Sequence, residues 1–132
     1  MPIKPLIPNI LLASALSLSL SIAQAANLND GYKAAIKGDY DEAFTIIRSK
    51  AIDGDANAQF TMAMMYHSGL GVKMDEQEAV KWYLTAAENG SIKAMEFISA
   101  GYENGWFGLP RDAERARYWY DRMEEAVSNT TP

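Results

Sequence analysis

The sequence has no cysteine and only one histidine. Without cysteine there is no disulfide framework, no thiolate metal site and no cysteine-linked lipid anchor, so packing alone must stabilise the fold. A metal site needs several converging ligands, and His67 has no partner at a ligand spacing. We therefore expect no metal and no cofactor.

Basic residues are also few. Lys and Arg number 12 against 17 Asp and Glu, and the formal net charge is −5 at pH 7. An acidic surface repels phosphate backbones and anionic lipid headgroups. We therefore expect no nucleic-acid partner and no binding to an anionic membrane surface.

Long hydrophobic runs are absent except near the start. Residues 10–23 read ILLASALSLSLSIA, an uncharged run that is shorter than the ~20 residues of a membrane span. Small residues, Ala23 and Ala25, then occupy both positions that a signal peptidase recognises. This pattern predicts a signal peptide over residues 1–25, cleaved between Ala25 and Ala26. The mature protein would be periplasmic or secreted, with no stable membrane insertion after cleavage.

The rest of the chain repeats itself. Three pairs lie 36 residues apart: Ala58 and Ala94, Tyr66 and Tyr102, Gly69 and Gly105. After one inserted residue the offset becomes 37 for Asp75 and Asp112, Ala79 and Ala116, and Trp82-Tyr83 and Trp119-Tyr120. A partial third copy precedes them, because Ala43, Ala51 and Gly54 lie 36 residues before Ala79, Ala87 and Gly90. An ordered series of this kind indicates a repeat architecture.

Each unit reads as two helices. Asp39 with Glu42 and Asp75 with Glu78 match the capping-box pattern, while Gly54 and Gly90 suit the position after a helix end. No segment alternates with the period of a strand. Helices are predicted near 28–37, 40–53, 56–68, 76–89, 92–104 and 113–127. They form a partial unit (28–54) and full units (55–90 and 91–127) within a domain of residues 26–127, followed by a disordered tail (128–132).

The helical spacing predicts how the units pack. Ala58, Met62 and Tyr66 fall on one stripe of a helix, and Ala79 and Trp82 belong to a second stripe. Alanines let helix backbones approach closely, and aromatic rings fill the space between units. One helix pair cannot bury such faces alone, so the pairs must stack. The predicted fold class is all-α: a short α-solenoid of stacked antiparallel helix pairs.

At this point the residues resemble a known family. The run A-x(3)-M-A-x(2)-Y-x(2)-G-x-G-V at 58–72, followed by D-x(3)-A-x(2)-W-Y-x(2)-A-A-x(2)-G at 75–90, is similar to a Sel-1-like repeat, a relative of tetratricopeptide repeats. Met62-Ala63 and Ile98-Ser99 stand where that pattern carries Leu-Gly. The resemblance implies a protein-interaction scaffold, and exported bacterial members resemble adaptors in envelope processes. Cysteine-rich relatives linked to β-lactam binding rely on disulfide-bridged helix pairs, so that activity is not expected here.

The resemblance also implies that the first helices of successive units line a concave surface. On the first helix of the central unit, Phe60, Met64 and His67 stand opposite the packed stripe. The next unit places Phe97 and Glu103 at and around the corresponding positions. An apolar patch on a curved groove predicts a binding site for a protein or an extended peptide. The alternative interpretation is that Phe60 and Met64 pack against neighbouring first helices.

No catalytic constellation is recognisable. The sequence has no G-x-S-x-G nucleophile turn, and GLG at 69–71 lacks the Lys and Ser or Thr of a phosphate loop. The sequence therefore predicts a non-catalytic scaffold or adaptor of the bacterial cell envelope that binds a protein or peptide. The alternatives are a small envelope hydrolase, acting on the cell wall or on β-lactams, and an inhibitor of an envelope enzyme.

Overall fold

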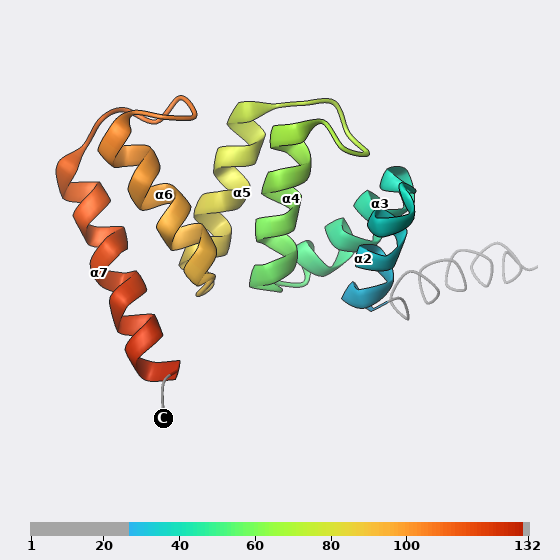
Figure 1. The fold of residues 1–132 in the computed structure, drawn as a ribbon, viewed down its shortest axis with the longest axis horizontal. Helices are drawn as coiled ribbons and strands as arrows, with labels where there is room; N and C mark the ends of the chain where they lie inside the picture. Colours follow the sequence, from blue (N-terminus) through green and yellow to red (C-terminus); the bar gives the residue numbers. More distant parts are fainter. Residues whose placement is uncertain (1–26, 131–132) are drawn as a thin grey trace, which may run out of the picture.

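The structure is a computed structural model, and it describes residues 27–130. In this part of the chain it contains six helices and no strand: α2 (Leu28–Lys37), α3 (Tyr40–Ile52), α4 (Ala56–Ser68), α5 (Glu76–Glu88), α6 (Ile92–Asn104) and α7 (Ala113–Thr130). The helices stand in a row, with α2 and α7 at opposite ends (Figure 1). This arrangement confirms the predicted all-α solenoid. The predicted signal peptide, residues 1–25, lies outside the described residues.

Short polar side chains begin most of the helices. Asp55, Asp75 and Ser91 each accept a hydrogen bond from the backbone N–H three residues later, at 2.8, 3.0 and 3.3 Å. Such bonds satisfy donors that the first turn of a helix leaves unpaired. The reciprocal capping box forms at α2, where Asn27 and Asp30 exchange side-chain bonds.

Asp39 departs from the predicted capping box, because its side chain makes no capping hydrogen bond. Only Gly38 and Asp39 connect α2 to α3, and the N–H of Asp39 donates to the carbonyl of Ala34 at 2.9 Å. This tight turn holds Asp39 at ψ 65°, outside the extended conformation that an N-cap side chain uses. The turn geometry therefore overrides the local sequence pattern.

The last helix is longer than predicted. Residues 128–130, expected in a disordered tail, continue α7 as far as Thr130. The hydroxyls of Ser128 and Thr130 donate to backbone carbonyls one turn earlier, Glu125 and Ala126, which lets these polar residues stay in the helix. Residues 131–132 lie outside the described part of the chain.

The core consists of two buried clusters. The first, around Ile47 and Met62, joins α2, α3 and α4, and the second, around Tyr83 and Ile98, joins α4, α5, α6 and α7. Tyr66 and Trp82 are partly buried and pack against both clusters. These two side chains therefore connect the two halves of the stack, in agreement with the predicted role of aromatics between units.

The loop after α4 also joins neighbouring units. Gly71 lies at φ +68°, and a Cβ atom there would collide with the backbone carbonyl of Tyr40 at the start of α3. Only glycine permits both the left-handed backbone and this close approach. The contact fixes the loop of the central unit against the unit before it.

We predict that Trp82→Ala lowers the free energy of unfolding by about 2–4 kcal/mol, because it removes a ring that packs against both clusters. Trp106→Ala is the matched control: its ring is 52% exposed, and the loss should be below about 1 kcal/mol. Urea denaturation followed by far-ultraviolet circular dichroism measures both. Equal losses would contradict the connecting role of Trp82.

We also predict that Gly71→Ala lowers the free energy of unfolding by at least about 2 kcal/mol, because the strain of the left-handed backbone and a collision with the carbonyl of Tyr40 add together. Gly54→Ala serves as the comparison. Gly54 has φ +96° with open space around it, so strain alone should cost about 1–2 kcal/mol. The same denaturation experiment distinguishes them, and a smaller loss for Gly71→Ala than for Gly54→Ala would refute the contact.

Candidate functional site

The predicted site residues divide into two groups. Phe60 and His67 of α4 and Phe97 of α6 are half-buried and lie in one aromatic cluster. Met64 is 47% exposed, and Glu103 is exposed as well. The structure thus brings three of the five predicted residues together, and the alternative interpretation fits Phe60 but not Met64.

Two further rings complete the cluster. Tyr83 of α5 stacks on Phe97 with ring centroids 4.0 Å apart, and Phe107 stacks on Phe97 at 4.3 Å. Phe60 also contacts Tyr83, with ring centroids 5.5 Å apart and the rings tilted. Aromatic pairs at these separations stabilise one another beyond the area they bury. We call these four rings, together with His67, the ring cluster.

His67 is held by rings alone. Its imidazole lies edge-on to Phe107 at 4.9 Å, with Phe97 and Tyr83 slightly farther away. Within the described residues no group of three or more His, Asp and Glu side chains could hold a metal ion. The histidine therefore acts as a flat, half-buried packing surface in this cluster.

Phe107 has an unusual backbone. Its φ of +58° is left-handed, and it is the one residue other than glycine with positive φ among residues 27–130. Sequence reasoning missed it, although a signal exists: Phe107 lies 36 residues after Gly71, which has φ +68°. A non-glycine residue in this conformation costs ~1–2 kcal/mol, so the ring contacts must hold it there.

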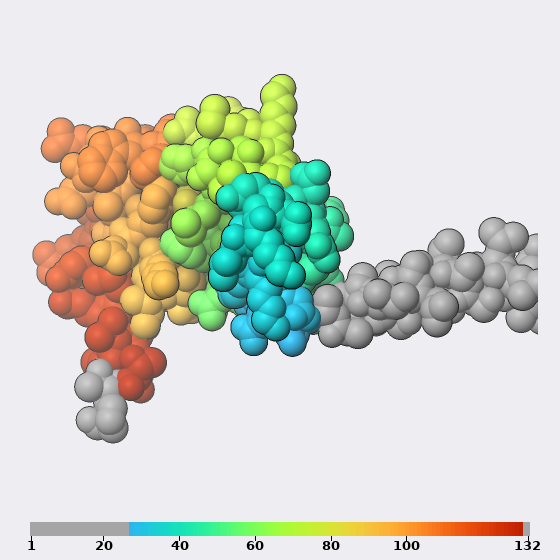
Figure 2. All heavy atoms as spheres, turned by 45° about the vertical axis from the view of Figure 1, so that its right-hand side comes forward, coloured from blue at the N-terminus to red at the C-terminus, as the bar shows by residue number. Residues whose placement is uncertain are grey.

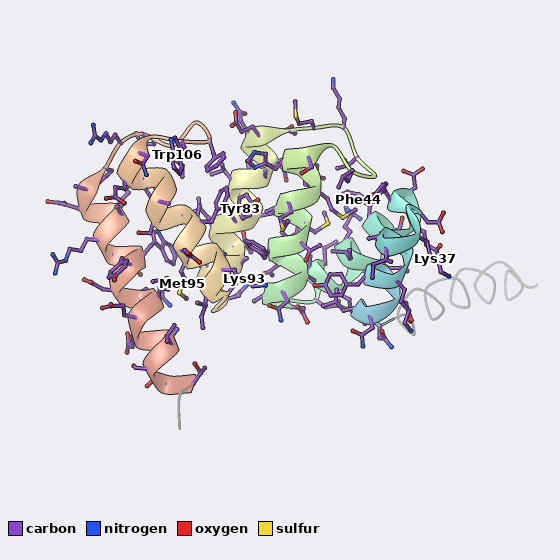
Figure 3. The ribbon with its side chains drawn as sticks, viewed as in Figure 1. Lys37, Phe44, Tyr83, Lys93, Met95 and Trp106 are labelled. Atoms are coloured by element: carbon purple, nitrogen blue, oxygen red, sulfur yellow. The ribbon has the colours of Figure 1, made fainter. Side chains whose placement is uncertain are left out.

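A groove runs beside the ring cluster between α4 and α6. It has a volume of about 470 Å³ and is lined by Phe60, Lys93, Glu96, Phe97 and Ala100. Figure 3 places Lys93 and Tyr83 in this region between the two helices, with Trp106 at the loop that follows α6. Lys93 was not predicted from the sequence. Its position on the first turn of α6 sets an ammonium group and the carboxylate of Glu96 beside an apolar floor.

An exposed ring extends the cluster to the edge of the molecule. Trp106 contacts Phe107 at a centroid separation of 6.1 Å, and it remains half exposed. Aromatic side chains with accessible faces are enriched at the centres of protein–protein interfaces. Ring contacts thus run from Trp106 through Phe107, Phe97 and the buried Tyr83 to Phe60, with Trp106 as the exposed end.

Two features describe the ionisation of the site: the pKa of Tyr83 and the charges that line the groove. Burial raises the pKa of Tyr83 to about 12, so its phenol is neutral near pH 7 and supplies no base or nucleophile. His67 makes ring contacts and no hydrogen bond to a hydroxyl within residues 27–130. The charges available at the groove are one ammonium and one carboxylate, which can orient a bound chain.

None of the helices between residues 27 and 130 is both long and apolar enough to cross a bilayer.

Comparison with solved structures places this geometry in a known fold. A Sel1 repeat protein from Oxalobacter formigenes superposes with a TM-score of 0.64 at 24% identity, covering 95% of this chain and 98% of that one. A protective antigen of uropathogenic Escherichia coli strains that displays an SLR fold matches with a TM-score of 0.58 at 35% identity. That match covers 70% of this chain and 19% of the antigen.

Curated proteins with similar sequences are much longer than this chain. The ERAD-associated E3 ubiquitin-protein ligase component HRD3A of Arabidopsis thaliana is 33% identical over 78 residues, which is 58% of this chain and 12% of that protein. Chitin synthase regulatory factor 3 of Schizosaccharomyces pombe is 31% identical over 84 residues, 64% of this chain and 9% of that protein. The chain therefore spans about a tenth of the length of these relatives.

The family model of the Sel1 repeat matches two consecutive segments, residues 56–91 and 92–126. Each segment corresponds to one helix pair, α4 with α5 and α6 with most of α7. Together the segments make up more than half of the chain, so this protein belongs to the Sel1 repeat family.

Proposed function

We propose that this protein is a non-catalytic adaptor that holds a protein or peptide segment on the groove between α4 and α6. Sel1 repeats commonly mediate contacts between proteins. The observation that carries the proposal is the path of rings from Trp106 to Phe60 beside a groove with one charge of each sign. An apolar floor supplies binding energy, and the flanking charges set the direction of the bound chain.

A hydrolase would need a nucleophile and a base held within hydrogen-bond reach. The single imidazole is instead enclosed by rings, and the neighbouring phenol of Tyr83 is neutral. These features favour binding over bond cleavage.

We further propose that the adaptor works in the bacterial cell envelope, after export. The support is the sequence pattern of residues 1–25, in which the uncharged run 10–23 leads into Ala23-Gln24-Ala25. The curated relatives include a component of a ubiquitin ligase and a regulatory factor of chitin synthase. By analogy, the partner here would be a larger envelope protein or enzyme.

We predict that a photocrosslinking amino acid at Ala100, on the groove, captures a discrete protein in living cells. The same amino acid at Thr45, exposed on α3, should capture none. Exchanging the groove charges, Lys93→Glu with Glu96→Lys, should lower the yield at Ala100 at least about fivefold, because orientation is lost.

Unchanged helical circular dichroism would show that the exchanged protein is folded, since both side chains lie at the surface groove. The adduct should appear in the periplasmic fraction or the medium if export is correct. Adducts of equal yield from both positions, or none from Ala100, would refute the groove as the binding site. An adduct only in the cytoplasm would refute the envelope assignment alone.

A further inference from the structure

The second full unit leaves a hollow at the end of the stack. It has a volume of about 450 Å³ and lies along α6 and α7, lined among others by Ser99, Glu103, Arg117, Tyr120, Asp121 and Glu124. We call this hollow the terminal seat.

The preceding repeat unit shows which element packs at the position that corresponds to the terminal seat. Tyr120 corresponds to Tyr83 at an offset of 37 residues. Tyr83 is 3% exposed because Phe97, from the next first helix, stacks on it at 4.0 Å. Tyr120 has no following helix among the described residues and is 48% exposed. The terminal seat is therefore the place where another first helix would pack.

The surface of α5 that α6 covers and the corresponding surface of α7 at the terminal seat differ in charge. Val80, Leu84 and Ala87 of α5 correspond to three charged residues of α7: Arg117, Asp121 and Glu124. In α5 these side chains belong to the buried cluster or pack against it. With Glu103 included, the terminal seat carries three acids and one base; Asp121 lies 3.6 Å from Arg117, and Glu124 accepts a hydrogen bond from Tyr120. A helix that docks there must therefore bring basic side chains to a partly apolar hollow.

The described chain has one helix that meets this requirement. The face of α2 turned away from its buried residues, Gly31 and Ala34, carries Lys33, Ile36 and Lys37. Ile36 is 86% exposed, an unusual position for a large aliphatic side chain at the surface, and Lys33 pairs only with the exposed Asp30 at 3.4 Å. This face combines one apolar residue with two cations, of which Lys33 is paired with Asp30 of the same helix.

Intramolecular docking is excluded by the shape of the molecule. The two helices lie at opposite ends of the row, and the space-filling view also keeps α2 apart from α7 (Figures 1 and 2). Only a second copy of the chain can bring α2 to the terminal seat. The contact would reproduce the junctions within the chain, where a second helix meets the next first helix, as α3 meets α4 and α5 meets α6.

We propose that the protein associates head-to-tail, with α2 of one copy on the terminal seat of another. Lys33 and Lys37 would face Asp121 and Glu124, and Ile36 would cover the ring of Tyr120. A heterologous contact of this kind does not close on itself in a dimer, so it extends the solenoid into longer chains. This proposal is independent of the groove between α4 and α6, which stays open along the extended stack.

Sedimentation velocity of the purified protein tests the association. The mean mass should rise with concentration beyond that of a dimer and fall as salt is added. Asp121→Lys with Glu124→Lys should raise the apparent dissociation constant about tenfold or more. Adding Lys33→Glu and Lys37→Glu to the same chain should restore association, because the charges are then exchanged across the contact.

The matched control is Asp53→Lys with Glu88→Lys, which changes the net charge equally at exposed positions outside the terminal seat. It should leave association unchanged. A protein that stays monomeric at every concentration would overturn the proposal and leave the charged residues of α7 as a solubilising cap. Equal weakening by the control would overturn it as well, since net charge would then explain the effect.

The absence of cysteine provides a direct geometric test. Lys33→Cys and Asp121→Cys proteins are mixed and oxidised, and the mixed disulfide should exceed either symmetric one. Tyr118→Cys, at a position 53% exposed on α7 outside the terminal seat, replaces Asp121→Cys as a control and should give little mixed product. A predominance of symmetric disulfides would overturn the head-to-tail arrangement.

Discussion

Close contact between helix backbones at alanine is the constraint on which this structure depends. Ala63, Ala79 and Ala94 are fully buried where α4, α5 and α6 meet. A larger side chain at any of these positions would push two helices apart, because protein interiors are already close-packed. Because the helices lie close together, aromatic rings on one unit can stack on rings of the next unit.

The groove is a product of the same constraint. Phe97 reaches Tyr83 because α5 and α6 pack together, and it stacks on Phe107 of the loop after α6, so the two stacks fix its ring as one wall of the groove. The left-handed backbone of Phe107 is maintained by these contacts. Helix packing therefore determines the shape of the surface, and the inserted loop adds the ring that extends it toward Trp106.

Much of this organisation could be predicted from the sequence, because repeats reveal themselves by spacing. The offsets of 36 and 37 residues located the units, and glycines such as Gly90, at φ +94°, marked helix ends correctly. The sequence pattern predicted a side-chain cap at Asp39 that does not form, because the two-residue turn before α3 sets the backbone conformation there. The ring cluster was found only in part, because a Phe at positive φ is an exception to local rules and Tyr83 was considered only as a residue of the repeat. Whether the groove binds a partner stays a prediction.

The connection between the two cores has a consequence for cooperativity. Tyr66 and Trp82 pack against both clusters, and α4 contributes residues to both, so the two halves of the stack meet at α4 and these two rings. In a linear array, opening can begin at an end and stop at a weak junction. The helices α2 and α3 can therefore open while α4 to α7 keep the groove intact, so amide protons of the first half should exchange faster than those around Ile98.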